Sequence, residues 1–554
     1  KKNAKSSKAS KKTLLIVESP SKAKTIGKYL GSNYKVVASV GHVRDLPKSK
    51  IGIDIDNDFE PEYIAIRGKG DLIKELRKEA KAAGKVYLAT DPDREGEAIS
   101  WHLAFLLGID PSSPCRIVFN EITKDAVKNA VKNPRPIDLK LVDAQQARRV
   151  LDRLVGYKIS PLLWRKIRRG LSAGRVQSAA LKIICDRENQ IKSFVPKEYW
   201  NIIVEFEKGK KFFAKLTEYD GQKINVDNKK SADEVLEALK SGTYKVCRII
   251  RKERKRKPFP PFTTSSLQQD AANKLGFTTK KTMMVAQQLY EGVEIKGQGI
   301  QGLVTYIRTD SVRISDEARA SAKTYITEVF GSKYTSNNVF SNKKKDIQDA
   351  HEAIRPSNIS LDPEAIKESL TKEQYGLYKL IWTRFLASQM AEAVFDAVQV
   401  SIENGKYGLR ANGSRLLFDG YQKVYATNLE EDKDNLLPEL SEGESLKEKS
   451  VDCQQKFTEP PSRFTEASLV KDLEEKNIGR PSTYAPIIAT LLERKYISRE
   501  KKLLVPTDLG FVVTELMEDY FKEIVDAGFT ADMEDRLDEV EVKDLSWKEI
   551  VRDF

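Results

Sequence analysis

Cysteine and histidine are scarce in this chain of 554 residues, which contains four cysteines and three histidines. No C-x-x-C pair exists and the histidines lack metal-ligand spacing, so the sequence excludes the usual zinc motifs and a dense disulfide framework. We expect four buried, reduced thiols in a cytoplasmic protein: Cys115, Cys185, Cys247 and Cys453.

Long apolar runs are missing as well. The longest, such as LAFLLGI at Leu103–Ile109, fall short of the roughly 18 residues that a membrane-spanning helix needs. The segment TLLIV, which follows the basic start KKNAKSSKASKK, is too short for the apolar part of a signal peptide. We therefore predict no membrane association and a disordered basic tail over residues 1–12.

Nucleotide-binding motifs are the third absence. No G-x-x-x-x-G-K-[ST] sequence occurs, which disfavours ATP hydrolysis at a P-loop. GQGIQG at Gly297–Gly302 fits G-x-G-x-x-G, but it precedes the β-branched segment LVTYIRT where a dinucleotide-binding fold would begin a helix. We reject NAD binding and expect chemistry that does not use nucleotide hydrolysis.

Positive charge is what the sequence has in excess. The formal net charge of +14 favours a polyanionic partner, nucleic acid before an anionic membrane. The length and the 40% of apolar residues are sufficient for roughly three to four domains with real cores.

Strand-like and helix-like segments alternate in the first part of the chain. TLLIVES (Thr13–Ser19) and KVYLAT (Lys85–Thr90) are typical of short buried strands, and each leads into a helical pattern. Ser19 or Ser21 is the expected N-cap of the first helix, and Gly31 its end. This order predicts an α/β domain whose ligands bind at the carboxyl ends of the strands.

Acidic residues follow both of these strands. In DPDRE, Asp91, Asp93 and Glu95 recur at every second residue, a spacing that directs them to one side of an extended backbone. Three close carboxylates repel one another unless a cation lies among them, and ligands that are all oxygen suit Mg²⁺. Glu18 can face the same point. The structural alternative is a solvated acidic turn.

Arginines recur at helical spacing in DAQQARRVLDRLVGY, where Arg149 and Arg153 share one side and Tyr157 closes the run. LSAGRVQS then places small residues ahead of Arg175 and Gln177. Small residues let the backbone approach a phosphate, arginine neutralises it, and an aromatic ring stacks on an unpaired base. The alternative for these arginines is salt bridging at the surface.

Two β-like regions flank a helical block. The first, from about residue 200 to 257, ends in RIIRKERKRK and is followed by PFPPF, which resembles a linker. The second, over residues 394–425, includes ENGKYGLRANGS, whose NG and GK pairs indicate hairpins. The pattern predicts one β domain into which the helical block is inserted.

Within that block, GLVTYIRTDS at Gly302–Ser311 places Tyr306 beside an arginine, two hydroxyls and a carboxylate. In one interpretation Tyr306 is a nucleophile and Arg308 is the cation that receives an anion. In the other, the ring packs and its hydroxyl finds a convenient partner. The residues alone leave both open.

Nine segments taken together resemble those of bacterial DNA topoisomerase I, of the type IA class: VESPSKAKTI, GHVRDLP, LATDPDREGEAISWH, FNEIT, DAQQARRVLDRLVGY, LSAGRVQS, GLVTYIRTDS, QDAHEAIRP and NIGRPSTYAPII. The resemblance runs from about residue 13 to the end, and GRPSTYAP is more similar to topoisomerase I than to topoisomerase III. It implies a multidomain fold of α/β, β and α parts that form a toroid. The implied division is a Toprim α/β domain (13–157), a helical DNA-binding domain (158–197 and 464–554), a β-rich hinge or arch domain (198–264 and 393–463), and an inserted helical domain with the catalytic tyrosine (265–392).

The resemblance implies an ATP-independent isomerase that relaxes negative supercoils. One DNA strand is cut by transesterification to Tyr306, which leaves a 5′-phosphotyrosine link, and the strand is religated after strand passage. Since a phenol with a pKa of about 10 is ionised only to about a thousandth at neutral pH, cations such as Arg308 must stabilise the phenolate. Lys22 is implied to contact the scissile phosphate and Glu18 to handle the proton of the 3′-oxygen.

The remaining implied roles concern the metal, the DNA and the partners. Mg²⁺ is expected at Asp91, Asp93 and Glu95 with Glu18, and polar roles at the catalytic site are expected for His351 and Asp310. The single-stranded segment of a negatively supercoiled duplex is expected to contact His42, Arg94, Arg148, Arg149, Asp152, Arg153, Tyr157, Ser172, Arg175, Gln177, Arg480, Ser482 and Thr483. His102 is expected to pack its helix. We expect a monomer in the bacterial cytoplasm, at the nucleoid, with RNA polymerase as a further partner through regions beyond this chain.

One feature departs from the family pattern. Relatives usually continue into zinc-binding or related C-terminal domains, whereas this sequence ends at LSWKEIVRDF without a cysteine cluster and begins without methionine. We therefore expect a catalytic core that cleaves and religates. Two other classes stay open: a Toprim nuclease or primase, which would not depend on Tyr306, and a non-enzymatic single-strand binder, which would need no metal site.

Overall fold

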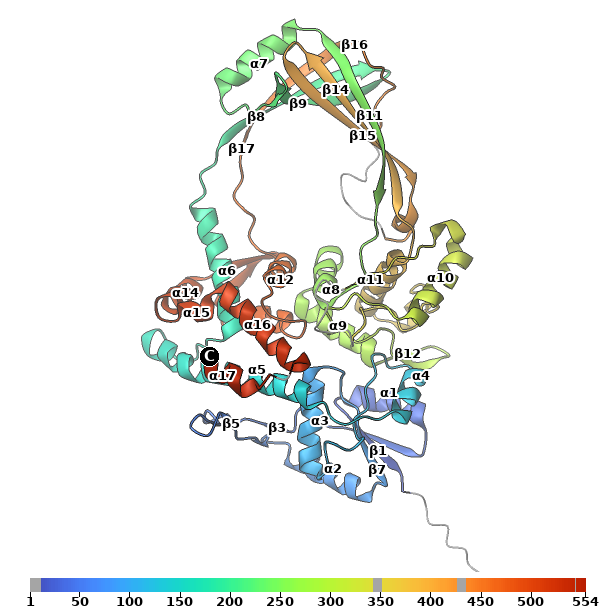
Figure 1. The fold of residues 1–554 in the computed structure, drawn as a ribbon, viewed down its shortest axis with the longest axis vertical. Helices are drawn as coiled ribbons and strands as arrows, with labels where there is room; N and C mark the ends of the chain where they lie inside the picture. Colours follow the sequence, from blue (N-terminus) through green and yellow to red (C-terminus); the bar gives the residue numbers. More distant parts are fainter. Residues whose placement is uncertain (1–10, 342–350, 426–434, 544) are drawn as a thin grey trace, which may run out of the picture.

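The computed structural model describes residues 11–341, 351–425, 435–543 and 545–554. Over these residues the ribbon follows a ring, with a parallel sheet and its helices at one end and a large antiparallel sheet with helix α7 at the opposite end (Figure 1). Apart from Lys11 and Lys12, the predicted basic tail lies outside the described residues. No described helix is long and apolar enough to cross a membrane.

A three-stranded parallel sheet organises the N-terminal part. Ser19 caps α1 by accepting a hydrogen bond from Lys22 N, and Gly31 ends it at a φ of 74°, both as predicted. The strands, in spatial order, are β2 (Tyr34–Ala38), β1 (Thr13–Val17) and β7 (Lys85–Leu88). The helices are α1 (Pro20–Leu30), α2 (Gly70–Ala82), α3 (Arg94–Leu107) and α4 (Lys124–Lys132), and the short strands are β3 (Arg44–Asp45), β4 (Ile53–Asp54), β5 (Glu60–Pro61) and β6 (Ile64–Ala65). Because β1 and β7 are parallel neighbours, their carboxyl ends bring Glu18 close to Asp91.

Helix α5 (Leu139–Lys166) runs without interruption through the predicted boundary at 157/158, with Pro161 inside it. Its buried residue Leu151 shares a core with Leu537 and Ile550 of the C-terminal helices. The other elements of this region are α6 (Arg175–Lys192), α12 (Glu466–Glu475), α13 (Tyr484–Glu493), β18 (Ile497–Glu500), β19 (Leu503–Pro506), α14 (Asp508–Tyr520), α15 (Lys522–Val525), α16 (Ala527–Val542) and α17 (Trp547–Asp553). The end of the chain therefore packs against its first third.

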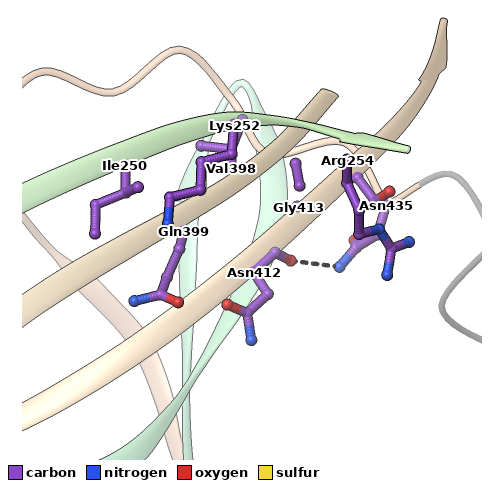
Figure 2. A pocket seen from close by; sticks show the side chains of 10 residues that line it. Ile250, Lys252, Arg254, Val398, Gln399, Asn412, Gly413 and Asn435 are labelled. Carbon is purple, nitrogen blue, oxygen red and sulfur yellow. Dashed lines mark hydrogen bonds between the residues drawn. The ribbon is translucent and has the colours of Figure 1, made fainter. Parts of the chain in front are cut away.

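The large sheet has the order β16-β11-β14-β15-β9-β8-β17, with β10 paired to β9. Its strands are β8 (Glu198–Lys208), β9 (Lys210–Tyr219), β10 (Gln222–Lys223), β11 (Tyr244–Arg256), β14 (Ala393–Asn404), β15 (Tyr407–Phe418), β16 (Ser445–Leu446) and β17 (Glu448–Phe457). Helix α7 (Lys229–Ser241) packs on it through a core that includes Val235, Val246 and Ile402. The sheet also carries a cavity of about 430 Å³ over β11, β14 and β15, lined by Lys252, Gln399 and their neighbours (Figure 2).

The hairpin predicted from the NG and GK pairs forms at one of its two positions. Gly405 and Lys406 connect β14 to β15 after Asn404, the last residue of β14, whereas Asn412 and Gly413 lie inside β15. Gly413 serves close packing there, because a Cβ atom would lie 3.0 Å from Asn435 O.

The inserted helices lie between β11 and β14 in sequence. They are α8 (Thr264–Asp270), the π-helical turn η1 (Ala271–Leu275), α9 (Thr279–Glu291), α10 (Asp316–Phe330), η2 (Ser332–Tyr334), η3 (Lys367–Ser369) and α11 (Lys372–Ser388), and the short helix η4 (Gly420–Lys423) follows β15. GQGIQG forms part of the hairpin of β12 (Val293–Ile295) and β13 (Gly299–Gln301) and begins no helix.

All four cysteines are free thiols, but the prediction that all are buried was wrong. Cys115 and Cys185 are buried, Cys453 is half-buried and Cys247 is exposed. Cys247 lies on β11 between Val246 and Arg248, where the pairing of β11 with β14 shifts by a β-bulge or similar irregularity, and its side chain is exposed there.

Candidate active site and nucleic-acid interface

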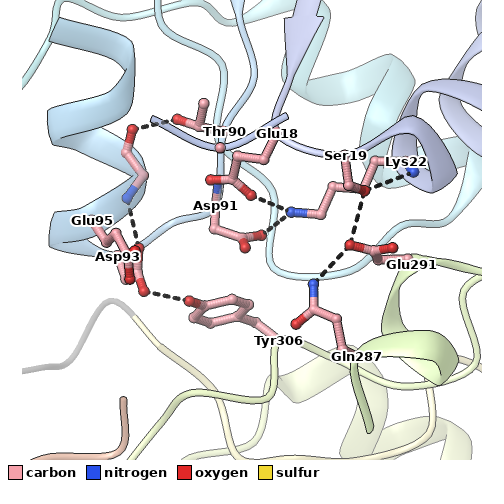
Figure 3. A network of polar contacts seen from close by, with 12 residues as sticks. Glu18, Ser19, Lys22, Thr90, Asp91, Asp93, Glu95, Gln287, Glu291 and Tyr306 are labelled. Carbon is pink, nitrogen blue, oxygen red and sulfur yellow. Dashed lines mark hydrogen bonds and ion pairs between the residues drawn. The ribbon is translucent and has the colours of Figure 1, made fainter. Parts of the chain in front are cut away.

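Tyr306 lies where the inserted helical block meets the carboxyl ends of β1 and β7 (Figure 3). Its buried hydroxyl donates a hydrogen bond to Asp93 Oδ2 at 2.6 Å, and its backbone N–H donates to Asn120 O at 2.7 Å. The chain bends at Ile307 and Arg308 and does not continue as an extended strand. Arg308 nevertheless reaches the same acids, with Nη1 at 3.0 Å from Glu95 Oε2 and 3.6 Å from Asp93 Oδ2.

The three acids of DPDRE do not lie along extended backbone, contrary to the expectation. Strand β7 ends at Leu88, and Asp93 is the N-cap of α3, where its side chain accepts a hydrogen bond from Gly96 N at 2.8 Å. Aspartate is favoured at this position because it satisfies a free N–H of the first helical turn. Glu95 therefore lies in that turn. The next residue, Gly96, has to be a glycine, because a Cβ atom at position 96 would lie 2.2 Å from Asp91 O.

Lys22 joins Glu18 to Asp91, with Nζ at 2.6 Å from Glu18 Oε2 and 2.5 Å from Asp91 Oδ1. Asp91 N also donates to Glu18 Oε1 at 2.7 Å. Burial and then the charge of Asp91 raise the pKa of Glu18 to about 8. Burial opposes ionisation of Asp91 too, but the charge of Lys22 outweighs it and lowers the pKa of Asp91. Near neutral pH, Glu18 therefore carries a proton and Asp91 does not.

The phenol of Tyr306 is also protonated in this state. Burial, followed by the charges of Asp93 and Asp91, raises the pKa of Tyr306 well above its ordinary value, although Arg308 opposes them. Asp93 Oδ2, which already accepts the hydroxyl proton in a hydrogen bond, is the group placed to receive it.

The carboxylates of this cluster are hard oxygen donors, the type that Mg²⁺ prefers. In the described part of the chain, however, no three His, Cys, Asp or Glu side chains are gathered in a way that could hold a metal ion. Cationic side chains pair with them: Lys22 with Glu18 and Asp91, and Arg308 with Glu95. The donor set fits Mg²⁺ chemically, on condition that these ion pairs rearrange.

Two of the three other polar residues predicted here are brought to the cluster. His351 Nε2 lies 2.9 Å from Pro92 O, and its ring meets that of Tyr306 at a centroid distance of 5.8 Å. His42 Nε2 lies 3.7 Å from Glu95 Oε1. Asp310 is exposed and has no hydrogen bond or ion pair with another described residue.

Four of the arginines predicted to contact DNA are bound to acids of α16. The pairs are Arg94 with Asp538 (3.1 Å) and Glu541 (3.0 Å), Arg148 with Glu534 (2.6 Å), Arg175 with Glu534 (2.6 Å), and Arg480 with Asp538 (2.6 Å). Glu534 and Asp538 are almost fully buried. The sequence analysis did not use these acids, although their spacing in DMEDRLDEVE places Glu534, Asp538 and Glu541 on one side of a helix.

Three of the four predicted groove residues of α5 contact the segment Asp45–Lys48. Arg149 Nη2 pairs with Asp45 Oδ2 at 2.5 Å, Arg153 Nη1 donates to Pro47 O at 2.8 Å, and Tyr157 Oη donates to Lys48 O at 2.5 Å. Asp152, on the same helix, is exposed. This segment and α5 thus form one surface.

The other predicted contacts lie near the starts of α6 and α13. Ser172 N donates to Tyr496 Oη at 3.0 Å, and Thr483 Oγ1 accepts from Arg480 N at 2.8 Å. Gln177 is half-buried, Ser482 is exposed, and His102 packs in a ring cluster with Tyr63, as expected for a structural histidine.

Sequence reasoning missed Gln287 and Glu291 of α9, and with them the contact between α9 and the N-cap of α1. Ser19 Oγ donates to Glu291 Oε1 at 2.9 Å, and Gln287 Nε2 donates to the same oxygen at 2.8 Å. Their signal was available, since QQLYEG precedes the Tyr306 segment closely and carries polar groups on a helix with an apolar face.

Two family models and a solved structure show what this chain is similar to. A family model described as DNA topoisomerase matches residues 136–552, and one described as Toprim domain matches residues 13–122. The solved structure of full-length topoisomerase I from Thermotoga maritima, in a monoclinic crystal form, is 44% identical and has a TM-score of 0.89, over 98% of this chain and 88% of that chain. The chain therefore belongs to the type IA family of bacterial DNA topoisomerases, isomerases that relax negative supercoils without ATP by tyrosine transesterification on one DNA strand.

Proposed function

We propose that Tyr306 is the tyrosine that this topoisomerase links to the 5′-phosphate of the cut strand. The observation that carries the proposal is the 2.6 Å hydrogen bond from Tyr306 Oη to Asp93 Oδ2, inside a cluster that also holds Lys22, Arg308 and a protonated Glu18. A nucleophile, a proton acceptor, two cations and a proton donor are thus within one site.

The proton transfers of cleavage follow from this arrangement. The bond from Tyr306 Oη to phosphorus forms as the bond from phosphorus to the 3′-oxygen breaks. The phenolic proton passes to Asp93, and the proton of Glu18 passes to the departing 3′-oxygen, which becomes a hydroxyl. Religation is the reverse: the 3′-hydroxyl returns its proton to Glu18, and Tyr306 leaves with the proton from Asp93. One phosphoester replaces another, so no ATP is consumed.

Lys22 and Arg308 supply the positive charge that the reacting phosphate needs. Lys22 is buried, and the charges of Asp91 and Glu18 outweigh burial and raise its pKa, so it stays cationic. A preorganised cation or donor at a developing anion is worth roughly 10² to 10³ in rate.

Mg²⁺ is part of the proposal, with Asp91, Asp93 and Glu95, together with Glu18, as the residues that would hold it. When bound, it would supply positive charge that orders the 3′-hydroxyl end for religation. The ion pairs of Lys22 and Arg308 with these carboxylates must then rearrange before the site can bind Mg²⁺.

We further propose that the single strand lies along α5, with Arg149, Arg153 and Tyr157 and the facing segment Asp45–Lys48. The enzyme would act as a monomer in the nucleoid on single-stranded parts of negatively supercoiled DNA. We also propose the division into domains and the partnership with RNA polymerase that the family resemblance implies.

The decisive test is a single-stranded oligonucleotide labelled at its 3′ end in one sample and its 5′ end in another. We expect only the 3′ label to become attached to protein on a denaturing gel, and no attachment in Tyr306→Phe. Tyr378→Phe is the matched control, because this buried phenol in the same helical block donates to Leu361 O at 2.7 Å, away from the site. Free cleaved ends in Tyr306→Phe would favour a nuclease and contradict the proposal.

A further inference from the structure

A second buried phenol lies beside Tyr306. Tyr290, in the last turn of α9, is fully buried, and its ring meets that of Tyr306 edge-on, at a centroid distance of 5.5 Å and an interplanar angle of 66°. Lys22 Nζ lies 5.3 Å from the centroid of the Tyr290 ring, close enough for a cation–π contact. One ring therefore contacts both the nucleophile and a cation of the site.

The hydroxyl of Tyr290 has no hydrogen bond in the described part of the chain. Two other buried tyrosines do have one: Tyr244 Oη donates to Leu239 O at 2.9 Å, and Tyr378 Oη donates to Leu361 O. An unsatisfied buried hydroxyl costs free energy, so each exception calls for an explanation such as a catalytic role or a bound water molecule.

The surroundings of this hydroxyl are anionic. A phenol with the ordinary pKa of about 10 is neutral at neutral pH, and no hydrogen bond of acceptable geometry joins this one to Asp91. The group is therefore a neutral donor. Such a donor is suited to an oxygen whose negative charge grows during the reaction.

Helix α9 also holds Tyr290 in place. The adjacent residue Glu291 accepts hydrogen bonds from Ser19 Oγ through its side chain and from Thr25 Oγ1, at 2.8 Å, through its backbone carbonyl. Both partners belong to the start of α1, which also carries Lys22. With α9 fixed in this way, the Tyr290 hydroxyl is held in position without a hydrogen bond to the described residues.

We propose that the Tyr290 hydroxyl donates a hydrogen bond to a non-bridging oxygen of the scissile phosphate, while its ring holds the ring of Tyr306 in line for attack. The proposal rests on the role of Tyr306 proposed above. Tyr290 adds a neutral donor to the positive charges of Lys22 and Arg308, and it neither gives up nor accepts a proton in the reaction.

The first experiment compares Tyr290→Phe with the wild-type chain in single-turnover cleavage of an oligonucleotide. We expect cleavage to slow by roughly 10²-fold, the scale for loss of one donor to a developing oxyanion, while oligonucleotide affinity stays within about twofold. Tyr378→Phe is the control that loses a satisfied buried hydroxyl, and it should cleave at the wild-type rate. A wild-type rate in Tyr290→Phe would overturn the proposal.

A second readout separates contact with the phosphate from mere packing. Sulfur in place of one non-bridging oxygen is a weaker acceptor, so one phosphorothioate diastereomer should cleave more slowly in the wild-type enzyme. In Tyr290→Phe this slowing should shrink for the same diastereomer, because the disturbed hydrogen bond is already gone. Equal sulfur effects in both proteins would contradict the contact.

Two controls keep the interpretation unambiguous. If Tyr306→Phe still forms the covalent product, the proposed function fails, whereas normal cleavage by Tyr290→Phe alone removes only this inference. If Tyr290→Phe does not fold, as judged by circular dichroism, fluorotyrosine at position 290 keeps the shape and strengthens the donor. The cleavage rate should then change, and an unchanged rate would overturn the proposal.

Discussion

Arg94 Nη1 lies 3.1 Å from Asp538 Oδ1, although the two residues are separated by 444 positions in the chain. Arg94 stands between Asp93 and Glu95, so this ion pair connects the acids of the candidate site to the C-terminal helix α16. Asp538 also binds Arg480 at 2.6 Å and is almost fully buried. The position of the first turn of α3 thus depends on a side chain from the other end of the protein.

Asp538→Asn is expected to destabilise the protein by roughly 3 to 5 kcal/mol, because it leaves buried arginine charges without their partner. The measurement is the free energy of unfolding in denaturant, followed by circular dichroism. Glu539→Gln is the matched control on the same helix, since its pair with Lys543 is exposed, and such pairs contribute about 1 kcal/mol or less. Equal losses in the two variants would show that Asp538 has no special role.

The lowered pKa of Glu534 lets us predict how the stability of the protein depends on pH. Burial alone would raise its pKa above the usual 4.5, but the surrounding arginines, Arg148 foremost, outweigh burial and hold it far below. Because the folded state binds fewer protons here than the unfolded state, the contribution is fully present above pH 4.5 and is lost as the pH falls through the folded pKa. Glu534→Gln should therefore be less stable than wild type at neutral pH, with a difference that narrows between about pH 5 and 3. A constant difference over that range would contradict the assignment.

The raised pKa of Glu18 lets us predict how the rate of cleavage depends on pH. With a pKa raised to about 8 by burial and by Asp91, it holds the proton that the 3′-oxygen needs at neutral pH and loses it at higher pH. The rate of single-turnover cleavage, measured without Mg²⁺, should fall as the pH rises through about 8. Glu18→Gln should remove this limb of the profile. An unchanged profile in that variant would assign the proton to another group.

The double variant Asp91→Ala with Asp93→Ala tests the metal assignment. We expect oligonucleotide binding to survive, because the basic surface of α5 is untouched, and religation to fail, because the carboxylates for Mg²⁺ are lost. Resealing of a cleaved oligonucleotide on addition of Mg²⁺ is the measurement, and chelation of Mg²⁺ from the wild-type enzyme should reproduce the defect. Resealing at the wild-type rate would refute the assignment.

Local features of the fold followed from the sequence, and long-range pairing did not. The cap at Ser19, the end of α1 at Gly31 and the hairpin turn at Gly405–Lys406 depend on a few neighbouring residues, and each was predicted. The approach of Glu18 to Asp91 followed from two parallel strands. The partners of Arg148 and Arg480 were out of reach, because an arginine-rich helix has the same local pattern whether its partner is a phosphate or an acid 386 residues away.

The acids of DPDRE show a second limit. Their spacing was interpreted as extended backbone, but Asp93 is itself a favoured N-cap, and α3 begins one residue later than it. The residue types indicated the chemistry of the site, but the preference of aspartate for the N-cap position determined the backbone geometry of these acids.

Helix α5 has a mechanical consequence for the whole ring. Its 28 residues form a rod of about 40 Å that belongs both to the neighbourhood of the parallel sheet and to the helical region beyond it. Two bodies that share one rod move together, so they cannot part without unwinding backbone hydrogen bonds. The contact between α1 and α9 has no such rod across it and relies on side chains such as Ser19 and Glu291. Of these two joints, the one beside Tyr306 has no continuous helix across it, so we expect an opening of the ring to break contacts there, such as the hydrogen bond from Tyr306 N to Asn120 O.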